Sequence, residues 1–261
     1  MLARLRLLAG CTSAKLAMLA GALLLAGCVS RPPQTAPTPP AWGSAADKNI
    51  TIALLGATGM AGGFILEQAL AEGYRVRALA RTPQKLAPFK DRVTIIQGDA
   101  RDLSTIETLL QGSNVVVSAL GPVKADGAAA KMVNTTVTGL VLQAMPKYDI
   151  KRYIVVSGAA VVMPGDDRNF TGWLMRQLAA LTLHDALEDK QAEYELLAAS
   201  SADWTLVRCP LIEAGPFVRS PRASLVTPTA FTLRAGDLAQ FVIDQIDSTE
   251  FIGKGPFLNS Q

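Results

Sequence analysis

The chain has 261 residues, with 25 Lys and Arg against 22 Asp and Glu, one histidine and three cysteines. Residues 1–27 hold three of the Lys and Arg and no acid, so the remaining chain carries 22 residues of each sign. This balance offers no basic surface for nucleic acid, and we expect no nucleic-acid partner. His184 and Cys209 are the only histidine and cysteine beyond residue 28, too few for a conventional zinc site, so no metal is expected.

Residues 1–27 have the pattern of an export signal. Three cationic side chains precede an apolar run, 16–27, that is too short for a membrane span of about 20 residues. The run ends in Leu-Ala-Gly-Cys at 25–28, which resembles the lipobox of bacterial lipoproteins. We therefore expect acylation of Cys28 and a membrane anchor, and Val29 favours the outer membrane, facing the periplasm. An uncleaved anchor or a misassigned start is the alternative, and an unused signal would leave the protein in the cytoplasm.

Two regions follow the predicted signal. Residues 28–47 are rich in proline and small polar residues, which favours an extended, semi-rigid tether. From 48 to 261, apolar β-branched segments alternate with segments of helical periodicity, the pattern of successive β-α-β units. The sequence therefore predicts one α/β domain with a Rossmann-type, doubly wound parallel sheet.

The periodicity places the elements of this domain along the chain. In order, we expect strand 49–55, helix 60–72, strands 75–80 and 93–97, helix 103–110, strand 114–119, helix 126–145, strand 152–157, a largely helical stretch 170–200, strand 204–208 and helix 237–246. The Pro- and Gly-rich segment 208–233 is expected to fold over the sheet, and residues 257–259 to close one edge.

The turn after the first strand is glycine-rich, with Gly56, Gly59 and Gly62 directly before and within the next helix. In such a turn the first glycine permits a tight bend, the second lets a pyrophosphate approach the backbone, and the third lets the helix pack on the strand. The helix N-terminus favours the anion. The sequence therefore predicts a dinucleotide site that includes Thr58 and Met60, and a purely structural turn is the alternative.

The GxxGxxG spacing resembles the short-chain dehydrogenase/reductase superfamily, in particular its atypical branch of NmrA-like and flavin-reductase-like NAD(P)H-binding proteins. The similarity runs from about residue 49 to the C-terminus. It includes Gly-Asp at 98–99, Ala-Leu-Gly at 119–121, Val-Ser-Gly at 156–158, Asp-Trp-Thr-Leu-Val-Arg-Cys-Pro at 203–210 and Arg-Ala-Gly-Asp-Leu-Ala at 234–239. The resemblance implies that Asp99 lies at the adenine and that Ala119, Leu120 and Gly121 belong to the cofactor site.

Arg81, at the end of the second expected strand, decides which cofactor we expect. An acidic residue about 20 positions after the glycines would bind the ribose hydroxyls of NAD, whereas an arginine there accommodates the 2′-phosphate of NADP. Because a guanidinium matches a phosphate and Lys85 adds charge nearby, we expect NADP rather than NAD. An arginine with only a surface role is the alternative.

The catalytic residues are less clearly marked, because the Tyr-x-x-x-Lys pair of the superfamily is absent and Ala186 stands four residues before Lys190. The resemblance implies that Lys190 reaches the nicotinamide ribose and that Ser157 contacts the substrate, although this serine could equally cap a turn. Tyr194 is the third catalytic candidate. Histidine is the residue type best suited to acid–base chemistry near neutrality, but we expect His184 to be a surface or packing residue.

Three functions stay open. The nucleotide site favours an NADP-dependent reductase of a small carbonyl, quinone or flavin-like substrate. The missing tyrosine favours a non-catalytic dinucleotide-binding or scaffold protein, and an epimerase or isomerase is a weaker third reading. A substrate pocket could be lined by Trp173, Met175, Phe217 and Phe231, which could also be core residues.

Two matters stay unresolved by the sequence. An exported domain would work in a periplasm where free NADPH is expected to be scarce, so the signal and the cofactor site point to different compartments. Members of the superfamily often form dimers, and a homodimer is therefore considered, although no stretch of this sequence identifies an interface.

Overall fold

The computed structural model describes residues 48–122, 127 and 130–259, without the side chains of residues 171 and 175. The predicted signal peptide, the acylation site at Cys28 and the tether lie outside the described residues. In the described part of the chain, the helices are too short or too polar to span a bilayer.

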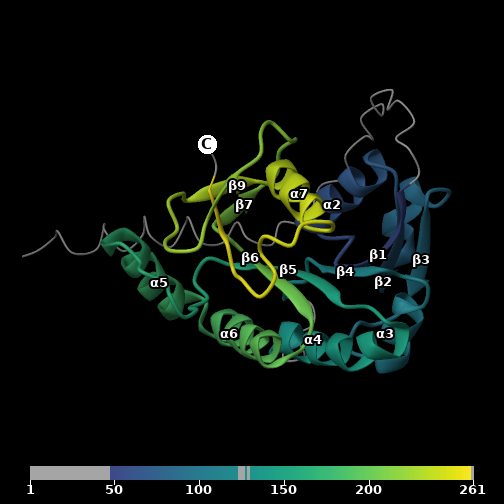
Figure 1. The fold of residues 1–261 in the computed structure, drawn as a ribbon, viewed down its shortest axis with the longest axis horizontal. Helices are drawn as coiled ribbons and strands as arrows, with labels where there is room; N and C mark the ends of the chain where they lie inside the picture. The colour runs from purple at the N-terminus through teal and green to yellow at the C-terminus, as the bar shows by residue number, and fades with distance from the viewer. Residues whose placement is uncertain (1–47, 123–126, 128–129, 260–261) are drawn as a thin grey trace, which may run out of the picture.

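Among the described residues, an eight-stranded sheet forms the centre of the molecule (Figure 1). Its strands are β1 (Lys48–Leu55), β2 (Tyr74–Ala80), β3 (Val93–Gln97), β4 (Val115–Ser118), β5 (Arg152–Gly158), β6 (Asp203–Cys209), β8 (Arg222–Ser224) and β10 (Phe257–Asn259). The order across the sheet is β3-β2-β1-β4-β5-β6-β10-β8, and only β8 runs antiparallel to its neighbour. A small parallel sheet pairs β7 (Leu211–Glu213) with β9 (Thr232–Arg234).

Helices cover both faces of the large sheet (Figure 1). On one face, α2 (Met60–Ala71) packs against α7 (Ala235–Asp244). On the other lie α3 (Leu103–Leu110), α4 (Val133–Ala144) and α6 (His184–Ala199), and α5 (Phe170–Thr182) extends beyond the end of α6. Short 3-10 helices occupy Pro83–Phe89 and Met145–Tyr148.

The central strands are apolar on both sides because each face of the sheet supports its own core. In β1, Ile52 and Leu54 pack with α2 and α7, whereas Ala53 and Leu55 pack with α3, α4 and α6. Burial on both faces is the reason that these strands read as continuous apolar runs rather than alternating ones. The predicted Rossmann-type, doubly wound sheet is confirmed, and its topological switch point lies between β1 and β4.

Three expectations about the elements were wrong in detail. The helix expected over 126–145 begins only at Val133, after Met132 with φ +57°. The segment 257–259 does not close an edge, because β10 lies between β6 and β8. The segment 208–233 is not only a covering loop, since it contributes β7, β8 and the start of β9. Strands of three residues have too few positions for a periodic pattern, so the sequence did not reveal them.

Candidate functional site

The glycine turn lies at the switch point, where the ends of β1 and β4 meet the start of α2. Gly56 has φ +83°, and a Cβ there would lie 2.5 Å from the carbonyl oxygen of Ala119. A Cβ on Gly62 would lie 2.1 Å from the carbonyl oxygen of Gly56. Neither position has room for a side chain. Gly59 is different: its Cβ would have one close neighbour, at 3.3 Å, so its missing side chain mainly leaves space at the start of α2.

The N-terminal end of α2 is suited to binding an anion. The helix begins after Gly59 without a side-chain cap and has no acidic residue in its first turn. The first N–H groups of a helix have no partners within it, and they carry partial positive charge. Thr58 is exposed beside them and Met60 is half-buried. The residues present at this turn therefore fit the pyrophosphate of a dinucleotide.

The end of β4 runs beside this turn. The backbone N–H of Ala119 donates to the carbonyl oxygen of Leu55 at 3.0 Å, which fixes the end of β4 against the end of β1. Ala119 and Leu120 are half-buried, and Gly121 is exposed. The segment that the resemblance assigned to the cofactor site thus borders the glycine turn.

Three charged residues gather at the carboxyl ends of β2 and β3. Asp99 accepts hydrogen bonds from the Nε and Nη2 atoms of Arg101, at 2.9 and 2.5 Å. This hydrogen bonding by Arg101, with a smaller contribution from the charge of Arg81, lowers the pKa of Asp99 to about 2. Arg101 was not among the predicted site residues, because an exposed arginine in a turn carries no pattern of its own. With two guanidinium groups and one carboxylate, this end of the sheet suits a phosphate.

Lys190, on α6, reaches the carboxyl ends of β4 and β5. Its ammonium donates to the carbonyl oxygens of Val156 at 3.2 Å and Leu120 at 3.5 Å. It also donates to Oδ1 of Asn134 and to the buried carboxylate of Glu193, each at 2.9 Å. The ammonium therefore lies at the carboxyl ends of β4 and β5, and protein groups already accept its hydrogen bonds.

The remaining catalytic candidates, Ser157 and Tyr194, have different surroundings. Ser157, near the carboxyl end of β5, is 5% exposed, and its hydroxyl has no hydrogen-bond partner among the described residues. An unpaired buried hydroxyl is costly, which suits a group that binds a polar atom of a ligand. Tyr194 instead packs edge-on against Trp204, near the start of β6, with ring centroids 6.1 Å apart. The structure thus gives Tyr194 a packing contact, and burial raises the pKa of its hydroxyl, with smaller effects from the charges of Arg208 and Asp166.

A cavity of about 470 Å³ lies between α5 and the carboxyl ends of β5 and β6. Gly158 and Ala159, directly after Ser157, form part of its wall, and Cys209 contributes from β6. Burial raises the pKa of the Cys209 thiol far above its usual value, so this sulfur is not a thiolate nucleophile. The volume is that of a site for a small organic molecule.

The apolar residues proposed for a pocket do not all line this cavity. Phe231 lines the cavity. Trp173 and Phe217 do not, and they are 49% and 44% exposed. The side chain of Met175 lies outside the described residues. Sequence alone could not separate these residues, because all four are equally apolar.

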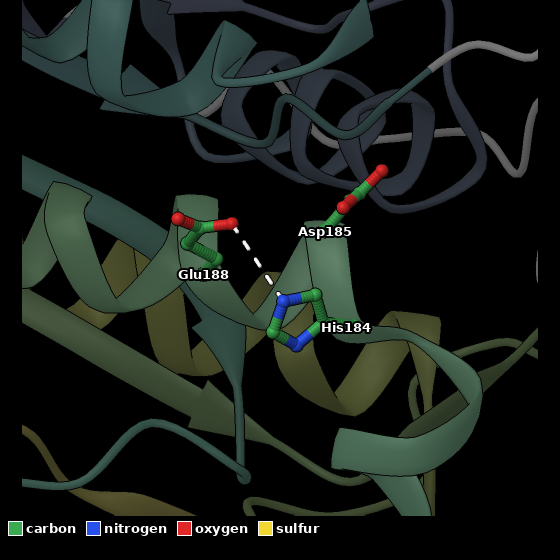
Figure 2. Close-up of side chains that lie close together, drawn as sticks. All are labelled: His184, Asp185 and Glu188. Carbon is green, nitrogen blue, oxygen red and sulfur yellow. Dashed lines mark ion pairs between the residues drawn. The ribbon is translucent and has the colours of Figure 1, made fainter.

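His184 belongs to an exposed cluster at the start of α6. Ligand atoms of His184, Asp185 and Glu188 lie within 4.8 Å of one another. Figure 2 shows the imidazole of His184 facing Glu188, 4.0 Å away. All three side chains are exposed, and Asp185 also lies 3.5 Å from the ammonium of Lys131. The arrangement fits exposed surface ion pairs, in keeping with the surface role expected for His184.

Comparisons with known proteins place the chain among nucleotide-binding proteins. Residues 56–249 match the model of a family described as NAD(P)H-binding. The fold is similar to a candidate exported protein from Burkholderia pseudomallei, with 27% identity over 81% of this chain and 100% of that one, and a TM-score of 0.64. No curated protein matches this sequence.

Two further structures share the fold at lower identity. One is ChuY, an anaerobillin reductase from Escherichia coli O157:H7, with 19% identity over 80% of this chain and 95% of that one, and a TM-score of 0.66. The other is a short-chain dehydrogenase/reductase from Veillonella parvula in complex with NADP, with 16% identity over 81% and 94% of the two chains and a TM-score of 0.68. The expected resemblance to short-chain reductases is thereby confirmed for the fold.

The ion pair between Asp99 and Arg101 predicts a measurable pH dependence. Because the folded pKa of about 2 lies below the ordinary value of 3.8, the pair stabilises the fold above pH 3.8, and this stability is lost as the pH falls toward 2. Arg101→Gln should therefore reduce the loss of unfolding free energy across that interval. Asp99 is 37% exposed, so after screening the difference should stay below about 1 kcal/mol.

Urea unfolding at several pH values within that interval measures the effect. Arg92→Gln, which removes an exposed cation at the other end of β3, is the matched control. Identical pH profiles for Arg101→Gln and the unmodified protein would contradict the assigned ion pair.

Proposed function

The chain belongs to the NAD(P)H-binding protein family, and from this premise we propose that it is an NADP-dependent reductase of a small molecule. The proposal rests on one observation: two features lie at the carboxyl ends of the parallel strands of the sheet. The glycine turn lies at the switch point between β1 and β4, and the cavity opens beside Ser157 two strands away. A cofactor and a substrate bound at these places would meet at the carboxyl ends of β4 and β5.

The preference for NADP rests on Arg81 and Arg101. Both lie at the ends of β2 and β3, beside the site expected for the ribose of the adenosine half of the cofactor. A 2′-phosphate would be attracted by their guanidinium groups, whereas the ribose hydroxyls of NAD would gain less from them.

Removing Arg81 tests this preference. Arg81→Ala should weaken NADPH binding by about tenfold or more and NADH binding by much less, because only NADPH presents a phosphate to the guanidinium. Isothermal titration calorimetry of the purified protein with both nucleotides gives the two affinities. Arg92→Ala serves as the charge control and should change neither affinity. Equal losses for NADPH and NADH would remove the argument for NADP.

In this proposal, the bound cofactor supplies a hydride, and the protein positions the substrate. Ser157 directly precedes the cavity wall at Gly158, and its hydroxyl, which has no partner among the described residues, would donate a hydrogen bond to the substrate oxygen on which negative charge develops. Lys190, held by Glu193 and Asn134, would position the ribose next to Leu120. No role in the chemistry is proposed for Tyr194, whose ring packs against Trp204. The substrate would be a small carbonyl, quinone or flavin-like compound.

The alternative is a non-catalytic dinucleotide-binding or scaffold protein. It is favoured by Ala186 at the position of the superfamily tyrosine and by the hydrogen bonds that already occupy the Lys190 ammonium. A turnover assay separates the two functions, because both allow NADPH binding and only a reductase consumes it.

We expect NADPH oxidation with at least one member of a panel of quinones, aldehydes and free flavins. Ser157→Ala should lower kcat by about tenfold or more while leaving NADPH affinity unchanged, because the lost hydrogen bond acts on the substrate. Tyr194→Phe is the control and should retain full turnover. Tight NADPH binding without oxidation by any acceptor would favour the scaffold function.

We propose further that the protein is exported and anchored through Cys28. The lipobox-like sequence supports this, as does the likeness to the candidate exported protein from Burkholderia pseudomallei over all of that chain. Cys28→Ser should abolish labelling by a palmitate analogue and move the protein from the membrane fraction to the soluble fraction. Unchanged labelling in this variant would contradict acylation at Cys28.

A further inference from the structure

The cavity beside Ser157 is apolar but carries positive charge. Two arginines line it, Arg168 from the loop after β5 and Arg176 from α5, and none of its described lining residues is acidic. Apart from Asn169, Thr229 and the Cys209 thiol, the rest of the lining is glycine or apolar. Charged groups on an apolar wall are costly unless a partner offsets them.

Arg168 is held in place by hydrogen bonds to the loop after β5. Its side chain is only 9% exposed. Nη1 donates to the carbonyl oxygen of Ala159 at 2.6 Å, while Nη2 donates to that of Val161 at 2.5 Å and to Asp166 at 3.1 Å. The Nε atom is buried and has no partner among the described residues. The guanidinium is therefore fixed by the loop, and its buried Nε–H is left for another acceptor.

The surrounding network does not neutralise this charge. Asp166 is shared between Arg168 and the buried Arg208, whose Nη1 lies 2.8 Å from both carboxylate oxygens. Arg176 adds a third guanidinium, and its Nε is also buried without a partner among the described residues. Burial and, to a smaller extent, the charge of Arg176 lower the pKa of Arg168. Three cations thus stand near one carboxylate.

We propose that this cavity binds the acidic group of the substrate, which we infer to be an apolar small molecule carrying a carboxylate. The carboxylate would accept hydrogen bonds from Nε of Arg168 and from Arg176, and the apolar part would lie against Phe231 and Pro210. A carboxylate suits this lining better than a phosphate, because it is less costly to remove from water. The inference rests on the proposed reductase function, since the cavity is the substrate site of that proposal.

The position of the cavity agrees with this orientation. Gly158 and Ala159 form part of the wall and directly follow Ser157, whose hydroxyl is unpaired. A molecule with its carboxylate on the arginines would therefore place another part of its structure near Ser157 and the end of β5. An acidic group that takes no part in the reduction would fix the orientation of the group that is reduced.

Naphthoate and naphthamide are suitable probes, because they match in shape and differ in charge. Titration calorimetry of the purified protein should show naphthoate binding about tenfold or more tighter than naphthamide, the difference expected for charge-assisted hydrogen bonds. Arg176→Gln should remove this preference, and Arg176→Lys should keep part of it. Arg219→Gln, which removes an exposed cation outside the cavity lining, is the matched control and should behave as the unmodified protein does.

NADPH affinity, measured on the same preparations, separates this inference from the proposed function. Unchanged NADPH affinity in Arg176→Gln, together with a lost naphthoate preference, supports the anionic site. Equal binding of naphthoate and naphthamide, or a preference that survives Arg176→Gln, overturns the anionic site even if NADPH binds. A naphthoate preference without NADPH binding would leave the anionic site in place and overturn the reductase proposal.

Discussion

The close approach of three backbone segments at Gly56 is the constraint on which the rest of the site depends. The end of β1, the start of α2 and the end of β4 meet there, and side chains at Gly56 or Gly62 would collide with backbone carbonyl groups. Because these segments touch, the uncapped N-terminus of α2 lies at the switch point. The same contact places Ala119 and Leu120 beside that helix end. One steric requirement thus positions both sides of the candidate nucleotide site.

The arrangement of charged side chains differs between the two halves of the sheet, compared at the carboxyl ends of the strands. At the ends of β2 and β3, Arg101 and Asp99 pair at the surface, where water screens them. At the ends of β5 and β6, Arg208 is fully buried and lies 3.6 Å from the ring centroid of Phe257. There the cations depend on Asp166 and on carbonyl groups of the loop. A low-dielectric site with excess positive charge interacts strongly with an anion, which is why the buried half carries the stronger argument for substrate recognition.

Buried polar atoms without hydrogen-bond partners also support substrate recognition at the ends of β5 and β6. Buried polar groups usually have partners, so exceptions that share one location call for a physical reason. The Ser157 hydroxyl and the Nε atoms of Arg168 and Arg176 are such exceptions among the described residues, and all lie on or beside one cavity. Lys190 illustrates the opposite case, since Glu193 and Asn134 accept its hydrogen bonds and hold it in place. The unpaired atoms of Ser157, Arg168 and Arg176 are therefore suited to binding a ligand, whereas Lys190 is suited to positioning one.

The Rossmann-type sheet and the glycine turn after its first strand were predictable from the chain alone, because periodicity and glycine spacing are local properties of the sequence. Helix 103–110 and strand 93–97 have the predicted bounds for this reason. Tertiary structure alone decided the rest. The start of α4 depends on Asp189 of α6, whose carboxylate accepts from the backbone N–H groups of Asn134 and Thr135. The arginine-lined cavity depends on segments that are brought together only by packing between distant parts of the chain, which leaves no periodic signal in the sequence.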